Sequence, residues 1–387
     1  MAGETYTPKE MLARLVGFDT VSARSNLELM RFVVDYLKGW GVAATLVPSD
    51  DGRKANLHAL IGPKVPGGIV LSGHTDVVPV EGQPWTHDPF TLVERDGRLY
   101  GRGTADMKGF VALALALVPE MAAADLTRPI VFAFSYDEEV GCLGAPRLVE
   151  AIARDLPRPE IVVVGEPTTM QPVNAHKGVN AFRVTVTGRD AHSSRPQDGA
   201  SAVRHAAELV SVVYALQDEA AAGADPRSPF VPPYASFNVG QIQGGTALNI
   251  IPRQCVFEFD YRPVPTDDVD AVIARLRDHA MREVLPRLKL GAPDGGIEIE
   301  RIAHVPALAP EPAGPAEALA CQLTGCNGAG VVAYGTEGGL FQAAGLSTIV
   351  LGPGDIAQAH QPDEYLEVAQ LAAGEGFLRK LIARAGV

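Results

Sequence analysis

Short, uninterrupted apolar runs divide much of this chain, and each leads into a turn and a helical pattern. The clearest of these runs are residues 67–73, 130–134 and 161–164. Strands that are covered on both faces carry continuous apolar stretches, and their alternation with helices is typical of a mainly parallel sheet between two layers of helices. The sequence therefore predicts an α/β fold.

The pattern changes near Gly178. Residues 180–187 alternate between polar and apolar side chains, which is typical of a half-buried strand in an antiparallel sheet. Strands and helices then follow in the order strand, helix, strand, strand, helix, strand, with predicted ranges of 180–187, 200–216, 235–240, 255–261, 267–285 and 296–302. This order predicts a ferredoxin-like α+β domain. We expect it at 178–306, inserted into a first domain that comprises 1–177 and 307–387.

Length and charge narrow the classes of partner. The 387 residues suffice for two domains, and 46 acidic against 33 basic residues give a net charge of −13. A chain this acidic is not expected to bind nucleic acid or an anionic membrane. Residues 1–6 lack the basic and apolar parts of a signal peptide, and no apolar run approaches the roughly 20 residues of a membrane helix. We therefore expect a cytoplasmic protein, with its four scattered cysteines as buried thiols.

Three consecutive acids, at positions 137–139, follow the apolar run 130–134. Acids at the end of a buried strand are costly unless positive charge meets them. Open α/β sheets place their sites at the carboxyl ends of strands. Because neighbours in an extended chain point in different directions, one of Glu138 and Glu139 can bind a metal while the other transfers a proton. The alternative is an acidic turn in solvent.

Four further side chains of the kinds that bind metals lie at the end of a predicted strand or the start of a predicted helix: His74, Asp106, Glu166 and His360. A lone histidine at a strand end is more often structural, but this many sites on one sheet indicate a metal centre. Zinc binds imidazole nitrogen and carboxylate oxygen, and a pair of zinc ions needs a bridging carboxylate. Two histidines and three acids satisfy that requirement and leave one acid for proton transfer. Asp76, two residues after His74, is expected to accept the other ring N–H of that histidine.

The motifs that carry these residues resemble those of the dinuclear zinc aminoacylase and carboxypeptidase family. They are His74–Pro79, Trp85 with Asp88–Phe90, Tyr100–Gly109 and Asp137–Glu139. The resemblance extends over nearly the whole chain, including the insert. It implies a zinc-peptidase-like catalytic domain with an inserted dimerisation or lid domain.

The resemblance also implies roles for individual residues. His74, Asp106 and Glu166 would hold one zinc ion, and Asp106, Glu139 and His360 the other. Glu138 would be the general base and acid, Asp76 would orient His74, and the peptide bond after the bridging Asp106 would be cis. The sequence does not distinguish zinc from cobalt or manganese, so cobalt is expected to substitute.

Three residues of the insert match functional positions of the family. His192 would reach the active site of a partner subunit and stabilise the oxyanion, which implies a homodimer. Asn249 and Arg262 match substrate-contacting positions, and an arginine fork suits a substrate carboxylate. The alternatives are a polar turn at His192 and a surface ion pair at Arg262. The glycines at 244–245 do not precede a helix, so nucleotide binding is not expected.

Five segments resemble the members of the family that hydrolyse acetylornithine: residues 165–168, 175–178, 334–339, 351–355 and 359–365. They imply removal of the acetyl group from N2-acetyl-L-ornithine, giving L-ornithine and acetate, as in arginine biosynthesis. Succinyl-diaminopimelate and other N-acyl amino acids are alternative substrates. A metal-dependent aminopeptidase and a non-catalytic binding protein are the alternatives outside this reaction, and the presence of Glu138 with all five ligands favours an enzyme.

Two interpretations of Glu337 stay open. It could lie near the δ-ammonium of acetylornithine, where a charge-assisted contact would favour that substrate. It could instead cap a helix that begins near Gly339, since an acid is favourable at a helix N-terminus.

Overall fold

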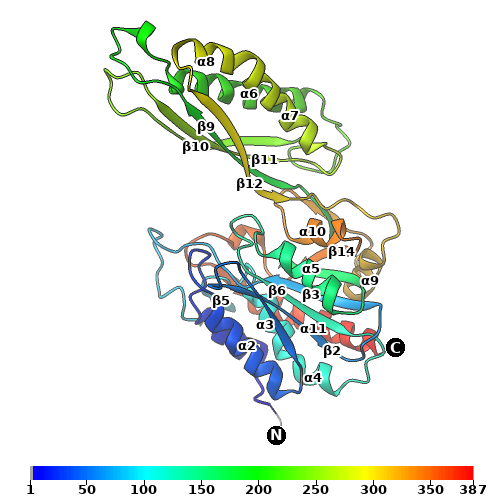
Figure 1. Cartoon of the computed structure of the whole chain (residues 1–387). Helices are drawn as coiled ribbons and strands as arrows, with labels where there is room; N and C mark the ends of the chain where they lie inside the picture. Colours follow the sequence, from blue (N-terminus) through cyan, green and yellow to red (C-terminus); the bar gives the residue numbers. More distant parts are fainter. Residues whose placement is uncertain (1–2, 387) are drawn as a thin grey trace. The chain divides into compact units, whose positions relative to one another are not determined.

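A computed structural model describes residues 3–386, which form two compact units (Figure 1). The first unit comprises residues 3–175, 308–331 and 336–386, and the second comprises 176–307 and 332–335. The second unit therefore includes a short segment, 332–335, that the sequence pattern assigns to the first domain. Among the described residues, no helix has the length and apolar character needed to cross a membrane.

An eight-stranded sheet forms the centre of the first unit. Its strand order is β1 (Ala44–Pro48), β2 (Ala55–Ile61), β6 (Ile130–Ser135), β3 (Gly68–His74), β7 (Pro159–Pro167), β14 (Ser347–Gly352), β8 (Val173–His176), β13 (Gly330–Val332). The four central strands, β6, β3, β7 and β14, run parallel. Antiparallel pairs flank them on both sides. The predicted mainly parallel sheet is confirmed.

Helices cover both faces of this sheet. One face shares a single apolar core with the following helices: α1 (Pro8–Val16), α2 (Leu27–Gly39), α3 (Lys108–Ala116), α4 (Val118–Ala123), α9 (Pro315–Thr324) and α11 (Val368–Ala385). Alternate strand residues belong to that core: Ile69 and Leu71 do, whereas the buried Val70 between them points to the opposite face. There α5 (Ala145–Asp155) packs on β2 and β6, and α10 (Gly338–Ala343) packs on β14 and β7 (Figure 1).

Helix α3 is buried along its whole length. It contacts α1, α11, β3 and β7, so no side of it faces solvent. An apolar character on all sides is what such an internal helix requires, and the run of valine, leucine and alanine after Phe110 supplies it. The element that follows Asp106 is therefore fixed in the core.

The second unit has the predicted ferredoxin-like order of elements: β9 (Val179–Thr187), α6 (Ala202–Ala222), β10 (Ser236–Gly244), β11 (Gln254–Arg262), α7 (Val269–His279) and β12 (Gly296–Val305). A π-helical turn (Ala280–Val284) and α8 (Leu285–Gly291) continue α7. The strands pair in the order β10-β11-β9-β12, all antiparallel, with α6, α7 and α8 on one face (Figure 1). Helix α6 continues six residues beyond the predicted end at Leu216. The prediction stopped there because the apolar periodicity ends, but residues 217–222 are mostly good helix formers and extend the helix.

Short elements escaped prediction. A small sheet of three-residue strands, β15 (Tyr365–Glu367), β5 (Arg98–Tyr100) and β4 (Val93–Arg95), belongs to the first unit, as does the 3₁₀ turn Ile356–Gln358. The second unit has a further 3₁₀ turn, Pro196–Asp198. Three residues are too few to show a period of two or of 3.6. The small sheet nevertheless matters for function, because it joins the motif Tyr100–Gly109 to the segment after His360.

A close contact between α3 and β7 provides a test of this packing. A Cβ atom on Gly165 would lie 2.0 Å from two ring atoms of Phe110. We expect Gly165→Ala to lower the free energy of unfolding by about 1–3 kcal/mol, because an overpacked core must shift. Urea denaturation measures the change. Gly376→Ala in α11 is the matched control, since nothing lies within 4 Å of its Cβ position. Equal stability of Gly165→Ala and the wild type would contradict this packing.

Candidate active site

Neighbouring parallel strands bring the first two candidate ligands together. Ser72 of β3 is in register with Val164 of β7, so His74 and Glu166, each two residues further along, meet at the carboxyl ends of their strands. The Nε2 atom of His74 lies 3.6 Å from a carboxylate oxygen of Glu166. Both side chains are buried. The adjacency and register of β3 and β7 therefore place this pair.

Asp106 lies between the two candidate histidines. Its Oδ1 atom is 3.0 Å from Nε2 of His74, and its Oδ2 atom is 3.4 Å from Nε2 of His360. His360 also lies 3.0 Å from Oε2 of Glu139. Each oxygen of one carboxylate thus faces a different imidazole, which is the arrangement expected of a carboxylate that bridges two cations.

The candidate ligand atoms form two overlapping groups. His74, Asp106 and Glu139 offer ligand atoms that lie within 4.8 Å of one another, and so do His74, Glu138 and Glu166. Glu138 is therefore close enough to the cluster to act on a molecule bound there. Its Oε1 atom accepts a hydrogen bond from the Cys142 thiol at 3.4 Å.

Burial and crowding determine the charge of the cluster. Burial raises the pKa of Glu138 and of Glu166 well above the ordinary value, and burial together with the Asp106 charge raises the pKa of Glu139 to about 7. Hydrogen bonds to Asp106 and Glu139 raise the pKa of His360 to about 10. So many buried acids need positive charge, which divalent cations would supply. Among the described residues, Oε1 of Glu139 is also buried without a hydrogen-bond partner. These donors therefore fit metal ions.

The contact predicted between Asp76 and His74 differs from the observed one. Nδ1 of His74 donates to the backbone carbonyl of Asp76 at 2.9 Å, whereas the nearer carboxylate oxygen is 3.7 Å away. The carboxylate instead accepts from the hydroxyl of Ser22 at 2.7 Å and from the backbone N–H groups of Glu138 and Glu139 at 3.1 and 3.3 Å. Asp76 thus orients the histidine through its main chain and the two glutamates through its side chain.

The acidic turn after β6 is not a turn in solvent. The side chain of Glu139 is 6% exposed and that of Asp137 is 14% exposed. Lys54 forms an ion pair with Asp137, so positive charge from the protein itself meets the first of the three acids. Asp137 adopts a positive φ of 58°, which turns the chain so that the next two residues approach the cluster.

The loop that carries Asp106 has the predicted cis peptide bond, between Asp106 and Met107. Sequence reasoning missed two residues beside it, Arg102 and Glu364. They form a fully buried ion pair at 2.8 Å. Both lie inside motifs that resemble the family, but a contact between positions 262 residues apart leaves no local signal.

The second unit holds three of the predicted site residues. His192 is exposed, and residue 193 donates its backbone N–H to the carbonyl of Asn249 at 3.0 Å, so these two sites are adjacent. Arg262 ends β11, whereas Asn249 precedes its start. The two ends of β11, Gln254 and Arg262, are eight residues apart, and at a rise of about 3.3 Å per residue they are separated by about 26 Å. Arg262 lies 3.4 Å from Asp260, as expected for the alternative of a surface ion pair.

The position of Glu337 agrees with the second interpretation, an acid at the start of a helix, although not through a capping bond. The residue occupies the N-cap position of α10, but its side chain makes no capping hydrogen bond. Instead it accepts from the hydroxyl of Ser72 at 3.1 Å. Glu337 is only 1% exposed, so a substrate ammonium has no access to it in this conformation. Its buried carboxylate lies close enough to His74 and Glu138 to interact electrostatically with both.

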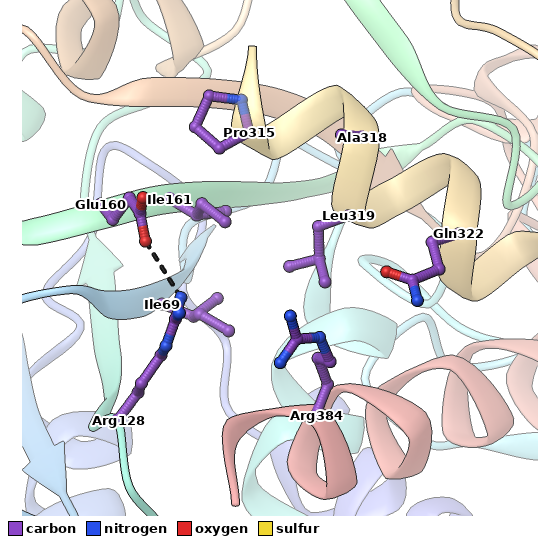
Figure 2. Close-up of a pocket in the computed structure, with 9 residues that line it drawn as sticks. All are labelled: Ile69, Arg128, Glu160, Ile161, Pro315, Ala318, Leu319, Gln322 and Arg384. Carbon is purple, nitrogen blue, oxygen red and sulfur yellow. Dashed lines mark hydrogen bonds and ion pairs between the residues drawn. The ribbon is translucent and has the colours of Figure 1, made fainter. Parts of the chain in front are cut away.

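A pocket lies at the opposite end of the same sheet from the cluster (Figure 2). Ile69 and Glu160, near the starts of β3 and β7, line it together with Leu319 of α9 and Arg384 of α11. An ion pair of 3.0 Å joins Arg128 to Glu160 at its edge. It contains none of the clustered imidazole and carboxylate donors found in the part of the chain that the structure describes.

A compact set of imidazoles and carboxylates at the ends of parallel strands is the arrangement of a metal-dependent hydrolase. The model of the family described as Peptidase family M20/M25/M40 matches residues 70–384, and the chain belongs to this family. The predicted family is thereby confirmed, and the protein is a hydrolase with a metal-binding site.

Individual relatives narrow the comparison. The chain is 35% identical over 382 residues to an acetylornithine deacetylase of Proteus mirabilis (strain HI4320), covering 96% of this chain and 95% of that protein. It is also 35% identical to an acetylornithine deacetylase of Shigella sonnei (strain Ss046), covering 92% of both chains. The fold is similar to that of an M20 family metallo-carboxypeptidase from Sulfolobus solfataricus, with a TM-score of 0.76 and 17% identity over 99% of this chain and 100% of the other.

The geometry around Asp106 predicts the metal content. Purified enzyme should contain close to two divalent metal ions per chain, and a chelator should abolish turnover. His360→Gln should lose one ion, because it removes the imidazole that faces Asp106 and Glu139. His279→Gln is the control, since His279 is a partly exposed histidine that also pairs with a carboxylate, Glu208, but lies in the second unit. Elemental analysis measures all three proteins. A fully active preparation without metal would contradict the assignment.

Proposed function

We propose that this enzyme removes the acetyl group from N2-acetyl-L-ornithine, producing L-ornithine and acetate. The identity of 35% to two acetylornithine deacetylases, over more than nine-tenths of the chain, carries the proposal. The cluster at Asp106 supports it, because it offers donors for two cations and one further acid. With it we propose zinc as the metal, replaceable by cobalt, and a role in arginine biosynthesis in the cytoplasm.

Two cations held by His74, Asp106 and Glu166 and by Asp106, Glu139 and His360 would polarise the acyl carbonyl and lower the pKa of a water molecule. Glu138 accepts the proton of the attacking water and then gives it to the leaving amine. Its position is fixed from two sides: Asp76 holds its backbone N–H, and the Cys142 thiol donates to its carboxylate.

The second unit supplies substrate contacts in this proposal. Arg262 binds the α-carboxylate, and its fork of N–H groups suits a planar carboxylate. His192 and Asn249 stabilise the acyl end, where negative charge develops on the carbonyl oxygen. Within one chain, Arg262 lies about 26 Å from the start of β11, which is the end of the sheet near Asn249 and His192. This separation is far longer than a small amino-acid derivative. A single second unit therefore cannot bring all three residues to one substrate, which supports a homodimer in which His192 acts in the partner's site.

A panel of substrates tests the reaction. We expect the highest kcat/KM for acetylornithine, with lower values for succinyl-diaminopimelate, acetylmethionine and a dipeptide. Glu138→Gln should keep its metal and its fold but lose about 10²–10⁴-fold in rate, the range of general acid–base catalysis. Release of free amine measures each reaction, and circular dichroism with elemental analysis provides the controls. A higher kcat/KM on any other substrate of the panel would show that acetylornithine is not the preferred substrate. Undiminished turnover of Glu138→Gln would show that another residue is the general base.

Mixing two inactive variants tests the action of His192 across subunits. A heterodimer of His192→Ala and Glu138→Gln chains has one site with both groups, so mixing should restore activity. Mixing Glu138→Gln with His360→Gln is the control, because both defects then lie in the first unit and each site of the heterodimer keeps one of them. Turnover of isolated, differently tagged heterodimers is the measurement. Absence of recovery in the His192→Ala mixture would show that His192 does not act in trans.

A further inference from the structure

Glu364 is a buried carboxylate whose two oxygens both face the loop of Asp106. Its Oε1 atom accepts from the backbone N–H groups of Ala105 and Asp106 at 2.9 and 3.1 Å. Its Oε2 atom accepts from the N–H of Gly103 at 3.0 Å and from the guanidinium of Arg102 at 2.8 Å. The residue is only 1% exposed. Four donors from five consecutive residues thus converge on one side chain.

These bonds fix the backbone of the candidate bridging residue. The N–H of Asp106 and that of the preceding residue are held by one oxygen, so the Cα atom of Asp106 cannot rotate away without breaking both bonds. Arg102 supplies the positive charge that makes an ionised Glu364 acceptable in the interior. The charge on Glu364 therefore serves to hold a loop, and no open surface leads to it.

A second path from the same ion pair leads to His360. Arg102 also donates to Oε1 of Gln83, and Gln83 donates through Nε2 to the backbone carbonyl of His360 at 3.0 Å. Arg102 further contacts the carbonyl of Gln361 at 3.3 Å and lies over the ring of Trp85 at 5.0 Å. His360 has a positive φ of 63° and a half-exposed side chain, so it depends on such contacts for its position.

We propose that Glu364 is a positioning residue for the candidate metal centre, holding Asp106 and His360 at the separation that binds the second cation. The inference rests on the metal centre of the proposed function and is independent of the substrate. Glu364 touches neither cation nor substrate. It acts through the backbone of Asp106 on one side and through Arg102 and Gln83 on the other.

Metal titration of Glu364→Gln tests this role. The amide keeps the size of the side chain but presents a donor to groups that also donate. We expect the second equivalent of Zn²⁺ to bind about 10–100-fold more weakly, the usual cost of losing a residue that orients metal ligands. The first equivalent should weaken less, because Asp106 is shared but His74 and Glu166 stay fixed on adjacent strands. Competition with a chelating dye measures both affinities. The visible spectrum of the cobalt-loaded protein, measured without substrate, should change most at the second equivalent.

Asp267→Asn is the matched control. Asp267 is a carboxylate that accepts a backbone N–H, that of Val264, at 2.8 Å, and it belongs to the second unit. Its loss should leave both zinc affinities unchanged. Glu364→Gln that folds and binds two zinc ions with wild-type affinity and spectrum would overturn the proposal, whatever the enzyme's substrate.

A second variant applies if Glu364→Gln does not fold. Gln83→Leu removes the path to His360, together with the acceptor of the Trp85 indole N–H, and leaves the bonds of Glu364 to the Asp106 loop in place. We expect it to weaken the second equivalent of zinc by a smaller factor than Glu364→Gln and to leave the first unchanged. Wild-type affinity for both equivalents in this variant would overturn the proposal in that case.

Discussion

The structure depends on one carboxylate shared between two imidazoles. Asp106 faces His74 with one oxygen and His360 with the other, and the remaining acids pair with these histidines, Glu166 on one side and Glu139 on the other. Several segments converge on this point: the ends of β3 and β7, the turn after β6, and the loops that carry Asp106 and His360. Buried apolar strands and the internal helix α3 provide the rigidity that lets acids of the same charge be held so close together.

Much of this arrangement could be predicted from the sequence because it follows from periodicity. Apolar runs mark the parallel strands and put His74 and Glu166 at strand ends, although the register that brings these two residues together is seen only in the structure. The antiparallel unit could be predicted for the same reason, since the alternation of residues 180–187 is local. The resemblance of the motifs to a known family added the cis peptide bond, which no periodicity indicates.

The rest could not be predicted because it depends on contacts between distant segments or on three-residue elements. Sequence spacing suggested that the Asp76 side chain accepts a hydrogen bond from His74. Its carboxylate instead accepts from the backbone N–H groups of Glu138 and Glu139, in the turn after β6. Glu337 looked like a residue at a helix start open to substrate, yet the packing of α10 against the sheet buries it. Glu364 and Arg102 lie in recognisable motifs, but nothing local reveals that they form a pair.

The two halves of the cluster differ in how they meet solvent. His74 and Glu166 come from adjacent strands and have side chains that are 1% and 6% exposed, whereas the side chain of His360 is 51% exposed on a loop. A cation between the strands would be held by side chains fixed on the sheet and closed to solvent, whereas one beside His360 would have a ligand that solvent reaches. The two positions should therefore exchange their ions with the medium at very different rates, so that a change in the metal supply of the cell would alter the outer position long before the inner one.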